Sequence, residues 1–141
     1  QAEHFSLSKP TIEKGIKPVC DALNSIPGVK TLWSCEGHPE RPAAPYVTFM
    51  ADTGFAYGVY KLLERAAAHD ELVFCWRLRA DFIEGGELQY TIESNDIRVL
   101  GRRRSWLNLF VVYHWSKSEM DRELLRLANL LKGVPGYRVN D

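Results

Sequence analysis

The chain has 141 residues, of which 45% are hydrophobic, and its 18 lysines and arginines balance its 18 aspartates and glutamates. This length suits one domain with its own core, and zero formal net charge excludes an overall field that would attract nucleic acid or an acidic membrane. Three cysteines at spacings that match no disulfide framework, and no apolar run as long as a membrane span, favour a cytoplasmic protein without a membrane segment.

The chain is expected to begin with a flexible arm at residues 1–10, followed by a single α+β domain at 11–141. The first predicted helix runs from about Thr11 to Ile26. Apolar residues recur in it at helical spacing, at Ile12, Ile16, Val19, Leu23 and Ile26. A Pro-Gly pair ends this helix, and Val29 to Trp33 is predicted as a short strand that leads into a loop beginning at Ser34.

The middle of the chain predicts three more strands and a second helix. Tyr46 to Met50 is the first of these strands, and Asp52 or Thr53 can cap the helix that follows. Two segments of alternating apolar and polar residues then predict a pair of strands with a glycine turn between them, at Phe74–Arg79, Gly85-Gly86 and Leu88–Glu93.

The last part of the chain predicts a central strand and a final helix. Leu107 to Trp115 is apolar on both faces, as a buried strand would be. Ser116 and Glu119 have the spacing of a capping box, and Gly133 closes the helix that follows. Its buried face is marked by Met120, Leu124, Leu127 and Leu131. The predicted fold class is therefore α+β, with a mostly antiparallel or mixed sheet of about five strands and about three helices.

One short segment at a strand end concentrates side chains that can do chemistry. It consists of Ser34, Cys35, Glu36, Gly37 and His38. We take the thiol, carboxylate and imidazole of this set as candidate catalytic groups, and the serine and glycine as candidate ligand-binding residues. Two chemistries stay open for the thiol and imidazole, half of a zinc site or a nucleophile with its base, although no third group can be assigned to orient the imidazole.

A complete metal site is not apparent in the sequence. Cys75 and His114 are the only plausible distant ligands for a metal held by the strand-end cysteine and histidine, and neither belongs to a second close pair. We therefore predict that the protein holds no metal. His114 is kept as a candidate ligand-binding residue.

The only dense basic run is a second candidate binding surface. Arg102, Arg103 and Arg104 lie in a predicted loop between strands, next to Trp106. Guanidinium groups bind phosphate in pairs of hydrogen bonds, and an indole can stack on a base. We expect these arginines and the strand-end loop to contact one anionic ligand, such as a nucleotide or RNA.

The segment around the strand-end loop resembles a known family. The residues Ala22-Leu23-Asn24, then Thr31, then Ser34-Cys35 and Gly37 are similar to the wybutosine-synthesis tRNA methyltransferase family, in which a helix and a strand lead into a serine-serine-cysteine-serine-glycine-arginine motif. The resemblance implies that the serine, cysteine and glycine line a pocket for S-adenosylmethionine and a modified guanosine of tRNA. Trp33 and Glu36 replace small serines of the family, and His38 replaces its arginine, so the pocket must differ in shape and charge.

Two functions from different classes follow from these features. The first is a domain that binds a nucleotide or nucleic-acid ligand at the Ser34 to His38 loop, as an S-adenosylmethionine-dependent or other nucleic-acid-modifying enzyme. The second is a non-catalytic binding or inhibitor module that uses the same loop to recognise a protein or a small ligand. The sequence leaves open whether the protein is an enzyme.

Overall fold

The computed structural model describes residues 11–40, 43–100 and 115–135. Within these ranges four strands form one antiparallel sheet in the spatial order β1-β2-β4-β3. The strands are β1 (Lys30–Cys35), β2 (Tyr46–Met50), β3 (Trp76–Phe82) and β4 (Leu88–Ser94). The helices are α2 (Lys17–Asn24), α3 (Thr53–Ala68), α4 (Ile97–Leu100) and α5 (Lys117–Lys132). The predicted α+β class is confirmed.

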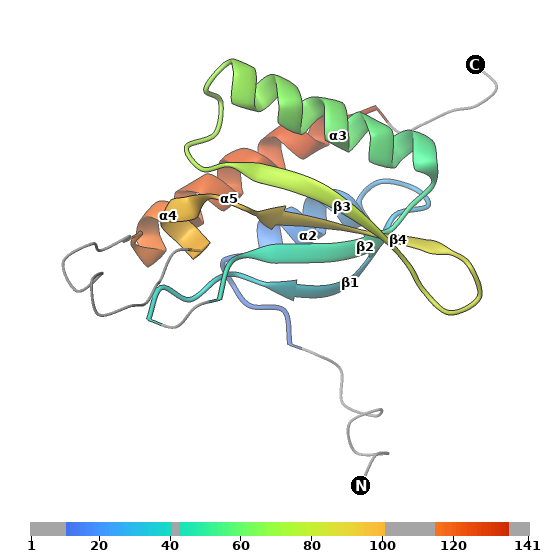
Figure 1. The fold of residues 1–141 in the computed structure, drawn as a ribbon, viewed down its shortest axis with the longest axis horizontal. Helices are drawn as coiled ribbons and strands as arrows, with labels where there is room; N and C mark the ends of the chain where they lie inside the picture. The colour runs from blue at the N-terminus through green and yellow to red at the C-terminus, as the bar shows by residue number, and fades with distance from the viewer. Residues whose placement is uncertain (1–10, 41–42, 101–114, 136–141) are drawn as a thin grey trace, which may run out of the picture.

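Two predicted segments lie outside the described residues. These are the arm at residues 1–10 and, apart from Trp115, the strand predicted at Leu107–Trp115. The three longer helices cover one face of the sheet, as Figure 1 shows, and α2 packs along α5. Among the described residues, none of the helices combines the length and the apolarity that crossing a bilayer would need.

The core lies between the sheet and these helices. Val47, Phe49 and Ile92 point into it from the central strands, each at most 1% exposed. The buried face of α5 is confirmed, with all four of its predicted members fully buried: Met120, Leu124, Leu127 and Leu131. Burial of this kind stabilises a helix far more than its intrinsic propensity does, because isolated helices of this length are marginal in water.

The predicted caps of α3 and α5 are confirmed. The carboxylate of Asp52 accepts a hydrogen bond from the Phe55 amide at 2.8 Å. The Ser116 hydroxyl accepts one from the Glu119 amide at 3.1 Å, and the Glu119 carboxylate accepts one from the Ser116 amide. These bonds satisfy amide groups that a helix start leaves without partners.

The first helix is shorter than predicted. It begins at Lys17 rather than near Thr11 and ends at Asn24 rather than Ile26. Proline has no amide hydrogen and fits the first turn of a helix, so Pro18 sets the helix start, and a helix from Thr11 would place it in the interior. Ile12, which was predicted on the buried face, is consequently 42% exposed.

The first and third strands also differ from the prediction. β1 continues through Ser34 and Cys35, which pair with β2 and were predicted as loop residues. β3 begins at Trp76 instead of Phe74, because the Phe74 amide donates to a helix side chain rather than to a neighbouring strand. The predicted turn at Gly85-Gly86 is confirmed, with both glycines at positive φ.

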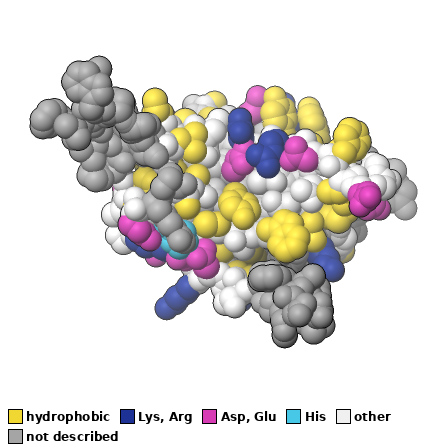
Figure 2. All heavy atoms as spheres, turned by 60° about the horizontal axis from the view of Figure 1, so that its bottom comes forward, with side chains coloured by type: hydrophobic (Ala, Val, Ile, Leu, Met, Phe, Trp, Pro, Cys, Tyr) yellow, Lys and Arg dark blue, Asp and Glu magenta, His cyan; other side chains and the backbone are white. Residues whose placement is uncertain are grey.

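The face of the sheet opposite the helices, here called the open face, carries two cross-strand rows of side chains. The tryptophan row consists of Trp33, Thr48, Thr91 and Arg79. The pocket row consists of Cys35, Tyr46, Glu93 and Arg77. Figure 2 views the molecule from the side away from α3 and shows hydrophobic side chains on this side with charged ones beside them.

Candidate functional site

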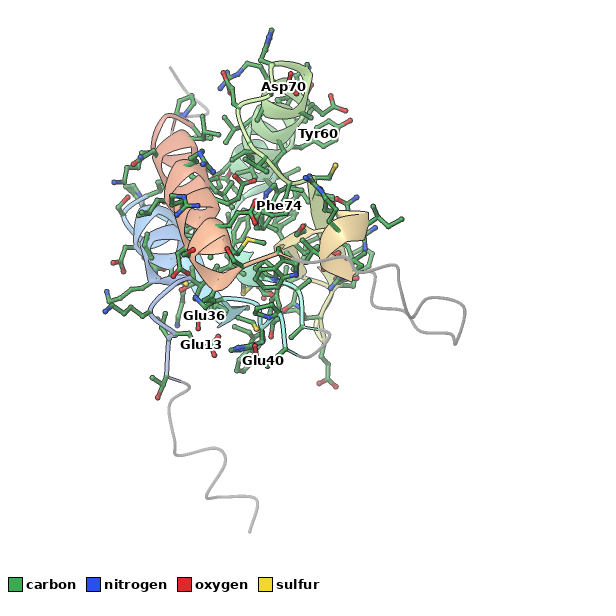
Figure 3. The ribbon with its side chains drawn as sticks, turned by 90° about the vertical axis from the view of Figure 1, so that its left-hand side faces the viewer. Glu13, Glu36, Glu40, Tyr60, Asp70 and Phe74 are labelled. Atoms are coloured by element: carbon green, nitrogen blue, oxygen red, sulfur yellow. The ribbon has the colours of Figure 1, made fainter. Side chains whose placement is uncertain are left out.

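Three side chains of types that can bind a metal ion converge where β1 ends. One atom from each of Glu13, Cys35 and His38 lies within 4.8 Å of the other two, and all three residues are half-buried. The His38 Nε2 atom lies 3.0 Å from a Glu13 carboxylate oxygen, and its Nδ1 atom lies 3.7 Å from the carboxylate of Glu40. Figure 3 shows Glu13 and Glu40 near each other at one end of the molecule. The cluster therefore joins two segments that are far apart in the sequence.

The carboxylate of Glu13 is held in its charged form. Burial raises the pKa of this group, but a hydrogen bond from the Glu36 amide and the proximity of His38 outweigh it, so the pKa is lowered overall. The Glu36 amide donates to Glu13 Oε1 at 2.8 Å. Hydrogen bonds to a carboxylate favour its ionised form and fix its direction. Glu13 is thus an oriented anion beside the imidazole and the thiol.

The side chain of Glu36 contacts the segment before α2 and the start of α5. It accepts a hydrogen bond from the Gly15 amide at 2.6 Å, and it lies 3.3 Å from the ammonium group of Lys117 at the start of α5. In the described structure these contacts hold the segment after β1 against the turn before α2 and against α5. It was predicted as a catalytic candidate, and the contacts described for its carboxylate are those with Gly15 and Lys117.

Gly37 allows the chain to turn between the thiol and the imidazole. Its φ of 84° is one that side-chain-bearing residues rarely adopt, and an added Cβ would lie 2.8 Å from Pro45 and 3.0 Å from the Trp115 ring. The next amide, that of His38, donates to the Ala43 carbonyl at 2.8 Å. The loop is therefore fixed in shape by packing and by backbone hydrogen bonds.

A cavity of about 310 Å³ opens beside the cluster and shares Cys35 with it. Its floor is the pocket row. The remaining lining residues come from the segment before β2, the end of β4 and α4: Ala43, Ala44, Pro45, Ser94, Asn95 and Leu100. The pKa of the Tyr46 hydroxyl is raised by burial and by the nearby Cys35 and Glu13. The tyrosine thus links the cluster to the cavity.

The basic side chains on this face are paired with acids. Arg77 lies 2.7 Å and Arg79 lies 2.9 Å from the carboxylate of Glu93. Arg79 also lies 2.9 Å from Asp81. Two guanidinium groups thus face two carboxylates, so the described part of the open face offers little net charge to an anion.

The remaining predicted site residues are not gathered at the cluster. Ser34 lies on the face of β1 opposite to Cys35, as strand alternation requires, and its hydroxyl is hydrogen-bonded to the Cys20 thiol of α2. Arg102, Arg103, Arg104 and His114 lie outside the described residues. Cys75 was considered from sequence as a distant metal ligand. It lies just before β3 instead, where its backbone amide and its thiol are both hydrogen-bonded to Asp96.

Glu13 is the member of the cluster that the sequence analysis missed. It supplies the third group that was absent from both open chemistries. In a nucleophile and base pair the thiol and the carboxylate face opposite ring nitrogens, but here each ring nitrogen of His38 has a carboxylate near it. A proton relay from thiol to imidazole is therefore not the chemistry that this arrangement favours. It favours a site in which the thiol, the imidazole and the carboxylate converge on one point.

A larger cavity of about 590 Å³ lies elsewhere, between α3 and the end of α5. Among the described residues that line it, Lys61, Glu64 and Arg65 carry charge and none is a cysteine or a histidine. The candidate site is therefore assigned by its chemistry and not by cavity size. Comparison with known proteins gives no significant match to any family model, curated protein or solved structure, and membership of the wybutosine-synthesis methyltransferase family stays a prediction.

Proposed function

We propose that this protein binds an unpaired nucleobase, as a nucleotide or in single-stranded RNA, on the open face of its sheet. The observation that carries the proposal is the position of Trp33. Its side chain is 56% exposed although the residue lies within a strand. It is the β1 member of the tryptophan row, on the face of the sheet that the helices leave uncovered. Indole rings on sheet surfaces are a common platform for stacking on bases.

The cavity at Cys35, two residues after Trp33 on the same strand, supplies hydrogen-bonding groups for such a ligand. Ser94, Asn95 and Tyr46 line it with hydroxyl and amide groups, and prolyl and alanyl side chains form its apolar wall. A cavity of about 310 Å³ is at the lower end of the range for small-molecule sites. Its size suits a single nucleoside rather than a large cofactor.

The pairing of the arginines sets the expected salt dependence. Each phosphate that a protein neutralises adds to the slope of affinity against salt, and Arg77 and Arg79 are already paired with carboxylates. Binding through the described face should therefore depend weakly on salt. A steep dependence would instead require the arginines at 102–104, which the sequence predicts as a phosphate clamp.

Binding of fluorescent single-stranded RNA oligomers, followed by anisotropy at two salt concentrations, tests the proposal. Stacking on one base is worth about 1–3 kcal/mol, so Trp33→Ala should weaken binding by about 5-fold to 150-fold. Phe82→Ala is the matched control, because this aromatic side chain is 77% exposed and alternation places it off the open face. It should change affinity less than about twofold.

One further measurement decides between the outcomes. Nucleosides, nucleotides and S-adenosylmethionine should be tested by the thermal shift that each produces, since a ligand of the native state raises stability by mass action. If no RNA, nucleotide or nucleoside binds, or if Trp33→Ala binds as tightly as the parent protein, the proposal is wrong. In that case a module that recognises a protein through the braced loop becomes the preferred function.

A further inference from the structure

We propose that Glu13, Cys35 and His38 form a binding site for a divalent transition-metal ion, with zinc as the expected ion. This inference goes beyond the nucleobase proposal and does not depend on it. It reverses the expectation, drawn from the sequence, that the protein holds no metal. The reason is that the structure supplies a third ligand from a segment where the sequence had predicted only a helix.

The spacing of the three groups suits one ion. Ligand atoms of tetrahedral zinc lie about 3.3–3.8 Å apart, given bonds of about 2.0–2.3 Å to nitrogen, oxygen and sulfur. The three donor atoms here lie within 4.8 Å of one another. Closing the set around an ion thus needs shifts of about 1 Å. The side chains of Glu13 and His38 can make such shifts while their backbones stay in place.

The donor types favour zinc over magnesium and calcium. A thiolate and an imidazole select borderline or soft ions, whereas hard ions take oxygen ligands almost exclusively. Three protein ligands also leave the fourth position of a tetrahedral ion for water or a ligand. That position would lie next to the cavity, because Cys35 belongs to both the cluster and the cavity lining.

The surroundings already orient the three ligands. The Glu36 amide fixes one oxygen of Glu13, which leaves the other oxygen directed at His38 Nε2. The Gly37 amide lies 3.4 Å from the Cys35 sulfur and can donate to a thiolate. The Glu40 carboxylate, 3.7 Å from His38 Nδ1, is placed to accept the proton of that nitrogen when Nε2 binds the ion. Metal-bound histidines usually have such a partner.

Metal content and cobalt spectroscopy test the site directly. The purified full chain is stripped with a chelator, reloaded with zinc chloride or cobalt chloride, dialysed and analysed for bound metal. We expect about one ion per chain, and with cobalt an absorption band from thiolate-to-metal charge transfer. Cys35→Ser should abolish that band and weaken zinc binding at least tenfold. The matched control is Cys75→Ser, which removes an exposed thiol outside the cluster.

Two further variants separate ligand loss from misfolding. Glu13→Gln and His38→Gln should each weaken zinc binding at least tenfold while the circular dichroism spectrum of the apo protein stays that of the parent. Glu40→Gln should weaken it less, because this residue acts through His38. The proposal is overturned if the parent binds no zinc or cobalt at micromolar concentration, or if binding survives unchanged in all three ligand variants. Failure of nucleobase binding would leave these results unaffected, so the two proposals fail separately.

Discussion

The buried carboxylate of Glu123 allows a quantitative test of how α5 is attached to the sheet. This side chain is 0% exposed although it ends in a carboxyl group. It accepts hydrogen bonds from the amides of Val73 and Phe74 at 3.0 and 2.8 Å, and from the Trp76 indole at 3.0 Å. Arg126 completes the set at 2.8 Å. One carboxylate thus accepts the hydrogen bonds of two backbone amides and one indole from the segment that leads into β3.

Replacement of Glu123 by alanine should lower the free energy of unfolding by about 3–5 kcal/mol, because it leaves two backbone amides and an indole without their acceptor. The individual costs of about 1–3 kcal/mol for each unsatisfied donor sum to more than this, but they are not additive. Domains of this kind have about 5–15 kcal/mol of stability in total, so the loss is a large share. Glu123→Gln retains one acceptor oxygen and should lose less.

Equilibrium urea unfolding, followed by circular dichroism, measures these differences if the slope against urea stays constant. Arg126→Ala is the control for the ion pair, because it leaves the other three hydrogen bonds of the carboxylate in place and removes a side chain that is 43% exposed, so it should cost less than Glu123→Ala. A loss below about 1 kcal/mol for Glu123→Ala would refute the reasoning. So would an equal loss for Arg126→Ala, since the ion pair and not the hydrogen bonds would then hold the segment.

Two further predictions concern stability. Leu127→Ala should cost about 2–5 kcal/mol because Leu127 is fully buried, whereas Leu125→Ala at a half-exposed position should cost far less, and urea unfolding of both variants checks the difference. Hydrogen bonds from Arg98 chiefly lower the pKa of Asp96 from 3.8 to about 2. The ionised Asp96 therefore adds about 2 kcal/mol to the free energy of unfolding above pH 4, and this stabilisation is lost as pH falls through 2. Asp96→Asn should therefore be less stable than the parent at pH 7 and equally stable near pH 2. A constant difference between these pH values would contradict the assignment.

The elements with complete local signals were predicted well from the sequence. α5 has a capping box, an apolar face of helical period and a terminal glycine, all of which agree with one another, and its observed packing matches the prediction. The turn at Gly85-Gly86 has an equally local cause, because glycine adopts positive φ without strain. Such features depend on a few neighbouring residues and need no knowledge of tertiary contacts.

The candidate site was predicted only in part, because its third group depends on tertiary packing. Cys35 and His38 are close in sequence and were identified from their chemistry. Glu13 reaches them only because the helix starts late, at Lys17 with Pro18 in its first turn, and the segment before it lies against the end of β1. The proline was the available signal, since it disfavours a helix that continues through it. Glu36 could not be told from a catalytic acid without its contact to Gly15.

Strand alternation also explains why the two proposals involve neighbouring residues of β1. Trp33 and Cys35 are two residues apart, so both side chains lie on the open face, about 6.5–7 Å from each other along the strand. Ser34 between them points to the helices. A single nucleoside is long enough to stack on the indole at one end and to reach an ion at the cluster with the other. The open position of that ion would then face the ligand, an arrangement that a chain extended through Cys35 provides and a loop beginning at Ser34 would not.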